Sequence, residues 1–472
     1  MKKILMVNPP TGIFIRDDRC QSNVEEFLVS VTRPPHELLI MAAILENDGC
    51  KVVINDYPSE KKAMVDFKQD VIKFAPDILV VNATIPTLID DLACVRIAKQ
   101  INQNTLSVLR CGAIEQIAES VMNLEPMLDF ILYGETDFTL SEFLKSKNKE
   151  TVKGVFYRYE GKIIETQKRP FLKDLDSLPI VDRNMIKSNL YTRPDTEEAV
   201  GLIEVSRGCP YKCIFCLVPV AYGSVHRTRS VENVIREIRI CIKKYGITNF
   251  HFKSDLFSFK REWVLELCKE IIKNKLDIKW FANSRADTID KELISLMKNS
   301  GCFALAIGVE SGSQKILDKI GKKTNLDQIK NTFNLCRREK VKTYAYFIIG
   351  FPWDTEHTIR ETINFSKKID PDYIDFFFPY AFPGTKFYEI ARELGLIDVF
   401  SLDNIIKNSY INSQSPTLAI SKSRLIQLRK KALKEFYFRP GYILRTFKNC
   451  KNFNEVLRLL SYGMVSLKKI TG

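Results

Sequence analysis

The stretch Arg207-Gly-Cys-Pro-Tyr-Lys-Cys-Ile-Phe-Cys-Leu217 places three cysteines within eight residues of a chain whose other nine cysteines are scattered. Thiolates spaced in this way on one loop can converge on a common centre, and soft sulfur ligands select zinc or iron–sulfur clusters. A closed zinc site needs a fourth protein ligand, for which His226 is the nearby candidate. A cluster held by three cysteines instead leaves one iron open to a small molecule. The spacing favours the cluster, with zinc and unliganded thiols as the alternatives.

The residues around this stretch repeat a strand-and-helix pattern. Because right-handed crossovers give successive βα units one direction, we predict that residues 199–398 form a partial (β/α)6 barrel. Active sites of such barrels lie at the carboxyl ends of the strands, and the three cysteines directly follow the first strand. They should therefore lie at the mouth of the barrel. The six predicted strands are "GLIEVSR", "TNFHFKSD", "DIKWFANSR", "CFALAIGVE", "KTYAYFIIGF" and "YIDFFFPY".

Residues 1–148 show a separate alternation of five strands and intervening helices, typical of an α/β domain with a doubly wound, Rossmann-like parallel sheet. Ligands bind such sheets beyond the carboxyl ends of the strands. No GxGxxG follows the first strand, which argues against a dinucleotide. The domain is therefore predicted to be a binding module. The strand ends in question include Thr84, Gly112, Gly134 and Glu135.

Residues 149–198 are predicted to be a linker between these two domains. The linker contains "GVFYRYEGKIIET", which is typical of a hairpin that turns at Glu160 and Gly161. The remainder of the segment is interrupted by prolines and is predicted to be irregular.

Residues 399–472 are predicted to be a helical, basic C-terminal region, with 14 lysines and arginines against 3 acidic residues. Its predicted helix is amphipathic and suits a cap on the neighbouring domain, contact with an anionic membrane surface, or binding of nucleic acid or an acidic substrate. The cap is favoured, and nucleic acid is the weakest of these. The apolar positions at helical spacing are Leu425, Leu428, Ala432 and Phe436.

The composition is that of a globular protein with two or three domains: 472 residues, 45% hydrophobic and 27% charged. No apolar run approaches the roughly 20 residues of a spanning helix, and no signal peptide is recognised. We therefore expect a cytoplasmic protein, with peripheral membrane contact through the basic tail as the alternative. The sparse cysteines argue against a disulfide scaffold and for a reducing compartment.

Several motifs together carry a resemblance to a known family. "RGCPYKCIFC" resembles the CxxxCxΦC signature of the radical S-adenosylmethionine (SAM) superfamily, where Φ is aromatic. "IGVESGSQKIL", "YFIIGFPWDT" and "PYAFPGTKFYEIARELGLI" are similar to the branch that carries a cobalamin-binding domain. That branch includes methyltransferases and the anaerobic magnesium-protoporphyrin ester cyclase. "PPHELLIMAAILENDGCKVVINDYP" and "LDFILYGETDFTLSEFL" resemble its N-terminal domain.

The resemblance implies that Cys209, Cys213 and Cys216 ligate a 4Fe-4S cluster whose open iron binds the amino and carboxylate groups of SAM. It places Phe215 near the adenine and Asp255 near the SAM amino group. Simpler structural roles remain open: Arg285 could pair only with Asp287, Glu310 could cap a helix, and Gly350 could permit a tight turn. The further positions that it assigns to SAM end later strands: Ser284, Arg285, Glu310 and Gly350.

The resemblance also implies cobalamin at the strand ends of the N-terminal domain, at Thr84, Gly112, Gly134 and Glu135. None of the four histidines lies in an Asp-x-His-x-x-Gly motif. A cobalamin bound here would thus have no lower ligand from that motif, as in other members of this branch. The polar segment Arg16-Asp-Asp-Arg-Cys-Gln21, which follows the first strand, is a candidate cover for the corrin ring, with a surface loop as the simpler interpretation.

The function that these cofactors imply is an attack on an unactivated carbon by a 5′-deoxyadenosyl radical, followed by methyl transfer. The alternative is oxidative cyclisation of the cyclase type or another non-methylating outcome. Less favoured are a tRNA methylthiotransferase, which needs a C-terminal RNA-binding barrel, and a non-catalytic corrinoid or iron–sulfur protein. The expected partners are a small-molecule substrate, such as a lipid or tetrapyrrole, and an electron donor such as flavodoxin or ferredoxin.

Overall fold

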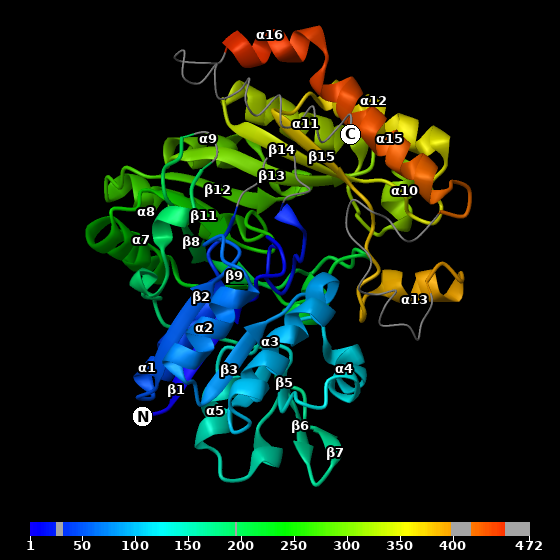
Figure 1. Cartoon of the computed structure of the whole chain (residues 1–472). Coiled ribbons are helices and arrows are strands. Elements are labelled where there is room, and N and C mark those ends of the chain that lie inside the picture. The colour runs from blue at the N-terminus through cyan, green and yellow to red at the C-terminus, as the bar shows by residue number, and fades with distance from the viewer. Residues whose placement is uncertain (25–31, 194–195, 398–416, 449–472) are drawn as a thin grey trace.

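The computed structural model describes residues 1–24, 32–193, 196–397 and 417–448. Two mainly parallel sheets dominate it, one in each half of the chain. In Figure 1 the N-terminal sheet, blue to cyan, lies below the barrel sheet, green to yellow. The predicted mixed α/β class, with its two separate strand-and-helix series, is therefore confirmed.

The N-terminal sheet has seven strands in the order β2-β1-β3-β4-β5-β6-β7, and its first five strands are parallel. Alternate residues of β1 point into two different cores, since Leu5 packs with one set of helices and Ile4 with the other. Both faces of the central strands are thus buried, which is why residues 4–7 and 78–81 are all apolar. The strands are β1 (Lys3–Asn8), β2 (Lys51–Asp56), β3 (Ile78–Asn82), β4 (Leu106–Arg110) and β5 (Phe130–Leu132). The helices are α1 (His36–Asn47), α2 (Met64–Phe74), α3 (Leu88–Ile101), α4 (Ala118–Leu124) and α5 (Thr139–Lys145).

The predicted hairpin forms from β6 (Val155–Tyr159) and β7 (Lys162–Glu165), which pair antiparallel around Glu160 and Gly161. It does not stand alone in a linker: β6 pairs antiparallel with β5 and extends the N-terminal sheet. Pairing satisfies the backbone groups along the edge of β5, which an isolated hairpin would have left open.

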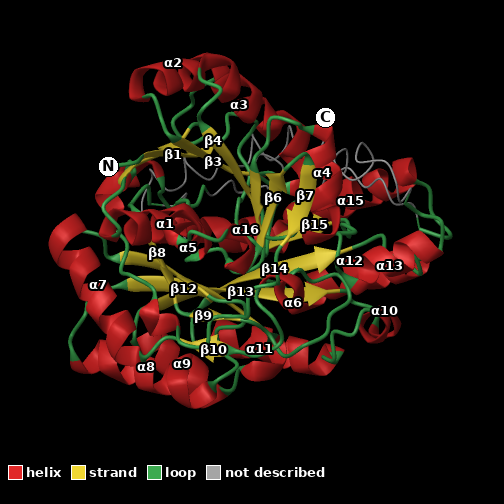
Figure 2. Ribbon diagram, turned by 90° about the horizontal axis from the view of Figure 1, so that it is seen from below, coloured by secondary structure: helices red, strands yellow, loops and turns green. Residues whose placement is uncertain are grey.

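The second sheet contains the six predicted strands in the unbroken order β8-β11-β12-β13-β14-β15, all parallel. Because β8 and β15 are not paired with each other, the barrel is partial, as predicted. Figure 2 shows α7, α8, α9 and α11 along one side of this sheet. The strands are β8 (Val200–Glu204), β11 (Asn249–Lys253), β12 (Lys279–Ser284), β13 (Cys302–Glu310), β14 (Lys342–Ile348) and β15 (Tyr373–Phe377). The helices are α7 (Val231–Tyr245), α8 (Arg261–Lys273), α9 (Lys291–Asn299), α10 (Gln314–Lys319), α11 (Leu326–Arg338), α12 (Glu356–Ile369) and α13 (Lys386–Glu393).

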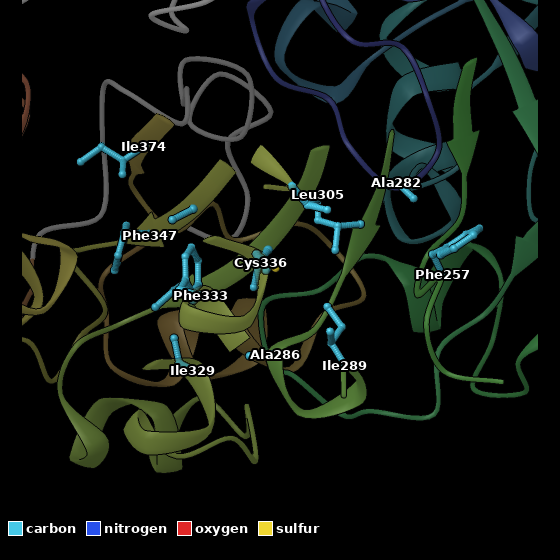
Figure 3. Packing of buried hydrophobic residues seen from close by; sticks show 14 of the residues in the cluster. Phe257, Ala282, Ala286, Ile289, Leu305, Ile329, Phe333, Cys336, Phe347 and Ile374 are labelled. Atoms are coloured by element: carbon cyan, nitrogen blue, oxygen red, sulfur yellow. The ribbon is translucent and has the colours of Figure 1, made fainter. Parts of the chain in front are cut away.

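The main core of this half lies between the barrel strands and the outer helices. Figure 3 shows Phe333 and Cys336 of α11 close to Phe347 of β14, with Leu305 of β13 nearby. All four side chains are at most 1% exposed. Because the outward-facing residues fill this core, the alternate, inward-facing residues of the same strands are left to line the inside of the barrel.

The C-terminal region described by the structure forms α15 (Lys422–Tyr437) and α16 (Pro440–Lys448). The four apolar residues predicted to share one face of α15 are all buried in the core of the barrel half. Arg429 of the same helix donates to the carbonyl of Phe376 at 2.6 Å. The capping interpretation is therefore confirmed for α15, whose apolar face packs on the barrel. Within the described ranges, no helix is both long and apolar enough to cross a membrane.

Candidate active site

The three-cysteine loop lies between two short elements at the carboxyl end of β8, namely β9 (Ser206–Arg207) and α6 (Val218–Ala221). The amide of Cys209 donates to the carbonyl of Gly223 at 3.2 Å. The amide of Gly208 donates to a carboxylate oxygen of Asp255 at 2.7 Å. These bonds hold the loop at the barrel mouth, where the sequence predicted it.

The three cysteine residues of the loop are partly exposed. Burial raises the pKa of the Cys209 and Cys216 thiols, and a bound cation would favour their thiolate forms. Six other described cysteines are packed in the cores, as expected for small hydrophobes. They are Cys94, Cys111, Cys241, Cys268, Cys302 and Cys336.

The zinc alternative required His226 as a fourth ligand. Its Nε2 atom lies 3.0 Å from the carbonyl oxygen of Leu256, and its ring packs edge-on against Phe259. Among the described residues, no group of three histidine, cysteine or acidic side chains is disposed to hold a metal ion. A 4Fe-4S cluster spaces its ligands more widely than a single ion does, so the three soft donors on one loop fit the cluster better.

A cavity of about 420 Å³ lies beside this loop, inside the barrel. Phe215 and Cys216 line one end, near the carboxyl ends of the strands, and Lys342 and Arg193 line the other. The N-terminal domain also contributes to the wall. Its lining residues are Ile15, Arg19, Cys20, Ser22 and Arg33.

Aromatic side chains make up much of this wall. They come mostly from inward-facing positions of the strands, and Tyr344 and Tyr373 stack on each other at 4.5 Å between ring centroids. Apart from Phe215, these residues were not among the predicted site residues. The signal was present in the alternation of "KTYAYFI", but that pattern does not say which face of a strand lines an empty interior. The aromatic lining residues are Phe215, Phe281, Phe303, Tyr344, Tyr346, Tyr373, Phe377, Phe378, Tyr380 and Phe382.

Two of the residues assigned to SAM line the cavity. Phe215 packs against Phe351 at 5.7 Å between ring centroids. Glu310 ends β13 and accepts a hydrogen bond from Nζ of Lys322 at 2.7 Å, so it does not serve as a helix cap. Glu310 also has a φ of 66°, a strained conformation for a residue other than glycine and one that clusters at functional sites.

Arg285 and Gly350 make contacts within the protein and do not line the cavity, so their assignment to SAM stays a prediction. Arg285 pairs with Asp287 at 2.9 Å and stacks on Tyr211, while its Nη1 lies 4.0 Å from the sulfur of Cys213. Gly350 turns the chain with its amide donating to Asp354 at 2.9 Å.

Ser284 is buried, the side chain of Asp255 is only 2% exposed, and neither residue lines the cavity. The hydroxyl of Ser284 has no partner among the described residues. Asp255 accepts from Gly208 and lies 3.5 Å from Nη1 of Arg19. Burial raises its pKa, and the Arg19 guanidinium partly offsets this.

The residues assigned to cobalamin lie at the strand ends, as predicted, but contact other parts of the protein and do not line the cavity. The hydroxyl of Thr84 shares a 2.7 Å hydrogen bond with that of Thr87. Gly112 lies against Asp18, and Gly134 adopts a φ of 75°. Glu135 pairs with Arg227 at 2.7 Å, a contact between the two halves of the chain. These four assignments stay predictions.

The polar segment 16–21 is largely buried across the same strand ends and is not a surface loop. Arg16 pairs with Asp91 at 2.9 Å, and Asp18 pairs with Arg110 at 2.6 Å. Of this segment, only Arg19 and Cys20 reach the cavity.

A buried charge cluster joins the two halves next to the loop, and the sequence did not reveal it. Arg207 is 1% exposed and binds Asp137 of the N-terminal half at 2.7 and 2.9 Å and Glu204 at 2.7 Å. Lys253 likewise pairs with Glu37 of α1 and, at 3.0 Å, with Glu204. Residue types alone do not show such a cluster, since its members are distant in sequence.

Comparison with known proteins agrees with this architecture. The profile of the radical SAM superfamily matches residues 203–366. An uncharacterized methyltransferase of Pyrococcus horikoshii is 30% identical over 453 residues, which cover 94% of each chain. The anaerobic magnesium-protoporphyrin IX monomethyl ester cyclase of Rubrivivax gelatinosus is 24% identical over 438 residues, 90% of this chain and 77% of that protein.

Two solved structures share the fold across both halves. TsrM, a radical SAM methyltransferase from Kitasatospora setae, superposes with a TM-score of 0.66 at 15% identity, covering 84% of this chain and 78% of that one. OxsB, a cobalamin-dependent SAM radical enzyme, gives 0.63 at 18% identity, covering 91% of this chain and 61% of that one. At these identities the likeness is one of fold.

Proposed function

The chain belongs to the radical SAM superfamily, and we propose that it is a cobalamin-dependent methyltransferase acting on an unactivated carbon of a small molecule. The observation that carries methyl transfer is the 30% identity to a methyltransferase over 94% of the chain. The shared two-domain fold supports cobalamin, because TsrM has been solved with cobalamin and a [4Fe-4S] cluster and OxsB with aqua-cobalamin.

In this proposal Cys209, Cys213 and Cys216 hold a 4Fe-4S cluster. When the cofactors are bound, the cluster and SAM supply the 5′-deoxyadenosyl radical, and cobalamin supplies the methyl group. The partial exposure of all three cysteines, and the place of Cys216 in the cavity wall, support this assignment. Arg285, whose Nη1 lies 4.0 Å from the sulfur of Cys213, contributes positive charge beside an anionic cluster.

The chain's own residues position the reactants and exclude water. Phe215 offers an aromatic face to the adenine of SAM, and Glu310, fixed by Lys322, offers a carboxylate to its polar groups. Asp255 acts indirectly, because its carboxylate holds the amide of Gly208 and so fixes the loop. The aromatic walls keep a reactive substrate away from bulk solvent.

Cobalamin, in this proposal, binds where the N-terminal half meets the cavity. Ile15, Cys20 and Ser22 line this side, and Tyr380 and Phe382 of the barrel half pack into the N-terminal core. A lower histidine ligand is not expected. His226 is bound to a carbonyl, His251 stacks on Phe281, His357 lies on the exposed face of α12, and His36 is buried in α1. Reduction of the cluster requires an external donor such as flavodoxin or ferredoxin.

Oxidative cyclisation is the second candidate, because the Rubrivivax gelatinosus cyclase aligns with 90% of this chain. The two functions differ in one product. Methyl transfer moves a labelled methyl group from SAM to the substrate, whereas cyclisation leaves the substrate unlabelled.

The decisive experiment uses protein purified anaerobically and reconstituted with iron, sulfide and hydroxocobalamin. We expect a cluster signal in electron paramagnetic resonance that SAM perturbs, together with a five-coordinate cobalt(II) signal without nitrogen splitting. Reduction in the presence of SAM should release 5′-deoxyadenosine. A cluster signal without protein-bound cobalamin would exclude the methyl-transfer proposal.

Two single variants test the cluster ligands. Cys213→Ala should abolish both the cluster signal and 5′-deoxyadenosine formation, because one of three ligands is lost. Cys50→Ala is the matched control, since Cys50 is also partly exposed but precedes β2 in the N-terminal half. Equal iron content in the two variants would show that the loop does not hold the cluster.

A further inference from the structure

The shape of the cavity restricts the ligands that it can hold. Along β14, the alternate residues from Lys342 to Ile348 all line it, and six residue steps in a strand span about 20 Å. The interior of a (β/α) barrel is ordinarily filled by packed side chains. Here about 420 Å³ is open along the barrel, between mostly aromatic walls. Such a space suits an elongated, largely apolar ligand.

Arg19 is one of several charged residues in this mostly aromatic wall, and the others are Arg33, Arg193, Glu310, Lys342 and Asp375. Arg19 comes from the N-terminal half and lines the cavity, while its side chain is only 7% exposed. Nε donates to Asp17 at 3.3 Å, and Nη1 donates to the carbonyl of Ser254 and lies 3.5 Å from Asp255. The third nitrogen, Nη2, is buried and has no hydrogen-bond partner among the described residues.

A buried guanidinium nitrogen without a partner is costly, because it has lost its water without gaining a protein acceptor. Arg19 stays charged: its ion pairs with Asp17 and Asp255 keep its pKa raised despite burial. A planar guanidinium with one free N–H edge is a strong donor to carboxylate or phosphate oxygens. Arg33 lines the same cavity and adds positive charge on this side. The Nη2 donor thus lacks one acceptor, which an oxyanion of a bound ligand would supply.

SAM, the phosphate group of cobalamin and the substrate are the three possible sources of that oxyanion. Under the function proposed above, on which this inference rests, the open iron already binds the amino and carboxylate groups of SAM. The oxyanion then comes from cobalamin or from the substrate, and the elongated cavity that Arg19 lines fits the substrate. In the cobalamin-loaded enzyme used below, a cobalamin phosphate on Arg19 would leave no charge preference. We therefore propose that the substrate is an elongated, largely apolar molecule with a carboxylate or phosphate group, and that Nη2 of Arg19 binds this group. Arg19 thereby sets which carbon of the substrate lies beside the cluster.

The test compares two probes that share one chain and differ in the charge of its end, 11-(dansylamino)undecanoate and its methyl ester. Equilibrium dialysis against anaerobic holoenzyme with SAM present gives both dissociation constants. We expect the wild type to bind the carboxylate at least about tenfold more tightly than the ester, from the net value of a hydrogen bond to a charged group. Arg19→Gln should abolish this preference while leaving ester binding unchanged, and Arg19→Lys should keep part of it.

Ester binding serves as the folding control for each variant. Lys342→Gln is the positional control, because Lys342 lines the opposite end of the cavity and its loss should leave the preference intact. The proposal is overturned if the wild type binds neither probe, if it binds both equally, or if Arg19→Gln keeps the preference. It is also overturned if only Lys342→Gln removes the preference, since the anion would then lie at the far end.

A separate arm measures SAM itself, with 5′-methylthioadenosine as the analogue that lacks the carboxylate. If Arg19→Gln weakens SAM about tenfold but not the analogue, Nη2 belongs to SAM and the substrate proposal fails. These outcomes are independent of the proposed function. A wild type that forms 5′-deoxyadenosine but shows no charge preference refutes only this inference. One with the preference but no cluster signal refutes only the function.

Discussion

Replacing Gly208 by alanine should prevent the three-cysteine loop from forming. Gly208 has a φ of 84°, and a Cβ atom built there would lie 2.1 Å from the carbonyl oxygen of Val225 and 3.2 Å from that of Tyr222. Both contacts are backbone atoms, so no side chain can rotate away. The left-handed conformation costs a non-glycine residue about 1–3 kcal/mol, and displacing packed neighbours costs about 1–3 kcal/mol more.

Gly246→Ala is the matched control for this prediction. Gly246 also has a positive φ, 65°, but an added Cβ would meet no atom within 4 Å. The substitution should therefore lower the free energy of unfolding only by the cost of the left-handed backbone conformation, about 1–2 kcal/mol. The assay is iron and sulfide content per chain after anaerobic reconstitution, with the urea midpoint measured alongside. We expect Gly208→Ala to lose most of its cluster and Gly246→Ala to keep it. Full cluster content in Gly208→Ala, with a urea midpoint equal to that of the control, would refute the reasoning.

Three further predictions concern the fold. Arg207→Met should lower the free energy of unfolding by about 3–5 kcal/mol, because it leaves buried carboxylates unpaired; urea denaturation should show no comparable change for the exposed Arg424→Met. Burial lowers the pKa of His36 from 6.5 to about 3; the negative charge of Glu204 opposes this shift, and the positive charge of Lys253 adds to it. Between pH 6.5 and about 3 the unfolded chain therefore binds more protons than the folded chain, so the free energy of unfolding decreases as the pH is lowered through this range. His36→Gln should make this decrease smaller when denaturation is measured as a function of pH. Leu428→Ala, in the buried face of α15, should cost about 2–5 kcal/mol, whereas Leu444→Ala, 61% exposed on α16, should cost less than about 0.5 kcal/mol; equal costs would show that α15 is not part of the core.

The sequence by itself determined the elements and their order. Strands buried on both faces need unbroken apolar runs, and the runs in "KILMVNP" and "DILVVNAT" predicted two such strands. The turn at Glu160 and Gly161 predicted the hairpin because few residues tolerate a positive φ. The spacing of Leu425, Leu428, Ala432 and Phe436 predicted the buried face of α15. The three cysteines were evident because all of them lie on one loop. In each case the determining interactions are local.

Only the tertiary structure decided which polar residues meet. Arg19 and Asp255 lie 236 positions apart, and Arg207 and Asp137 lie 70 apart. Such contacts depend on how the two sheets are docked. The hairpin was predicted correctly but assigned to a linker, because its own sequence does not indicate that β6 pairs with β5. The cavity is likewise a tertiary property. Alternation shows that a strand has two faces, but only the curvature of the whole sheet decides that one face encloses open space.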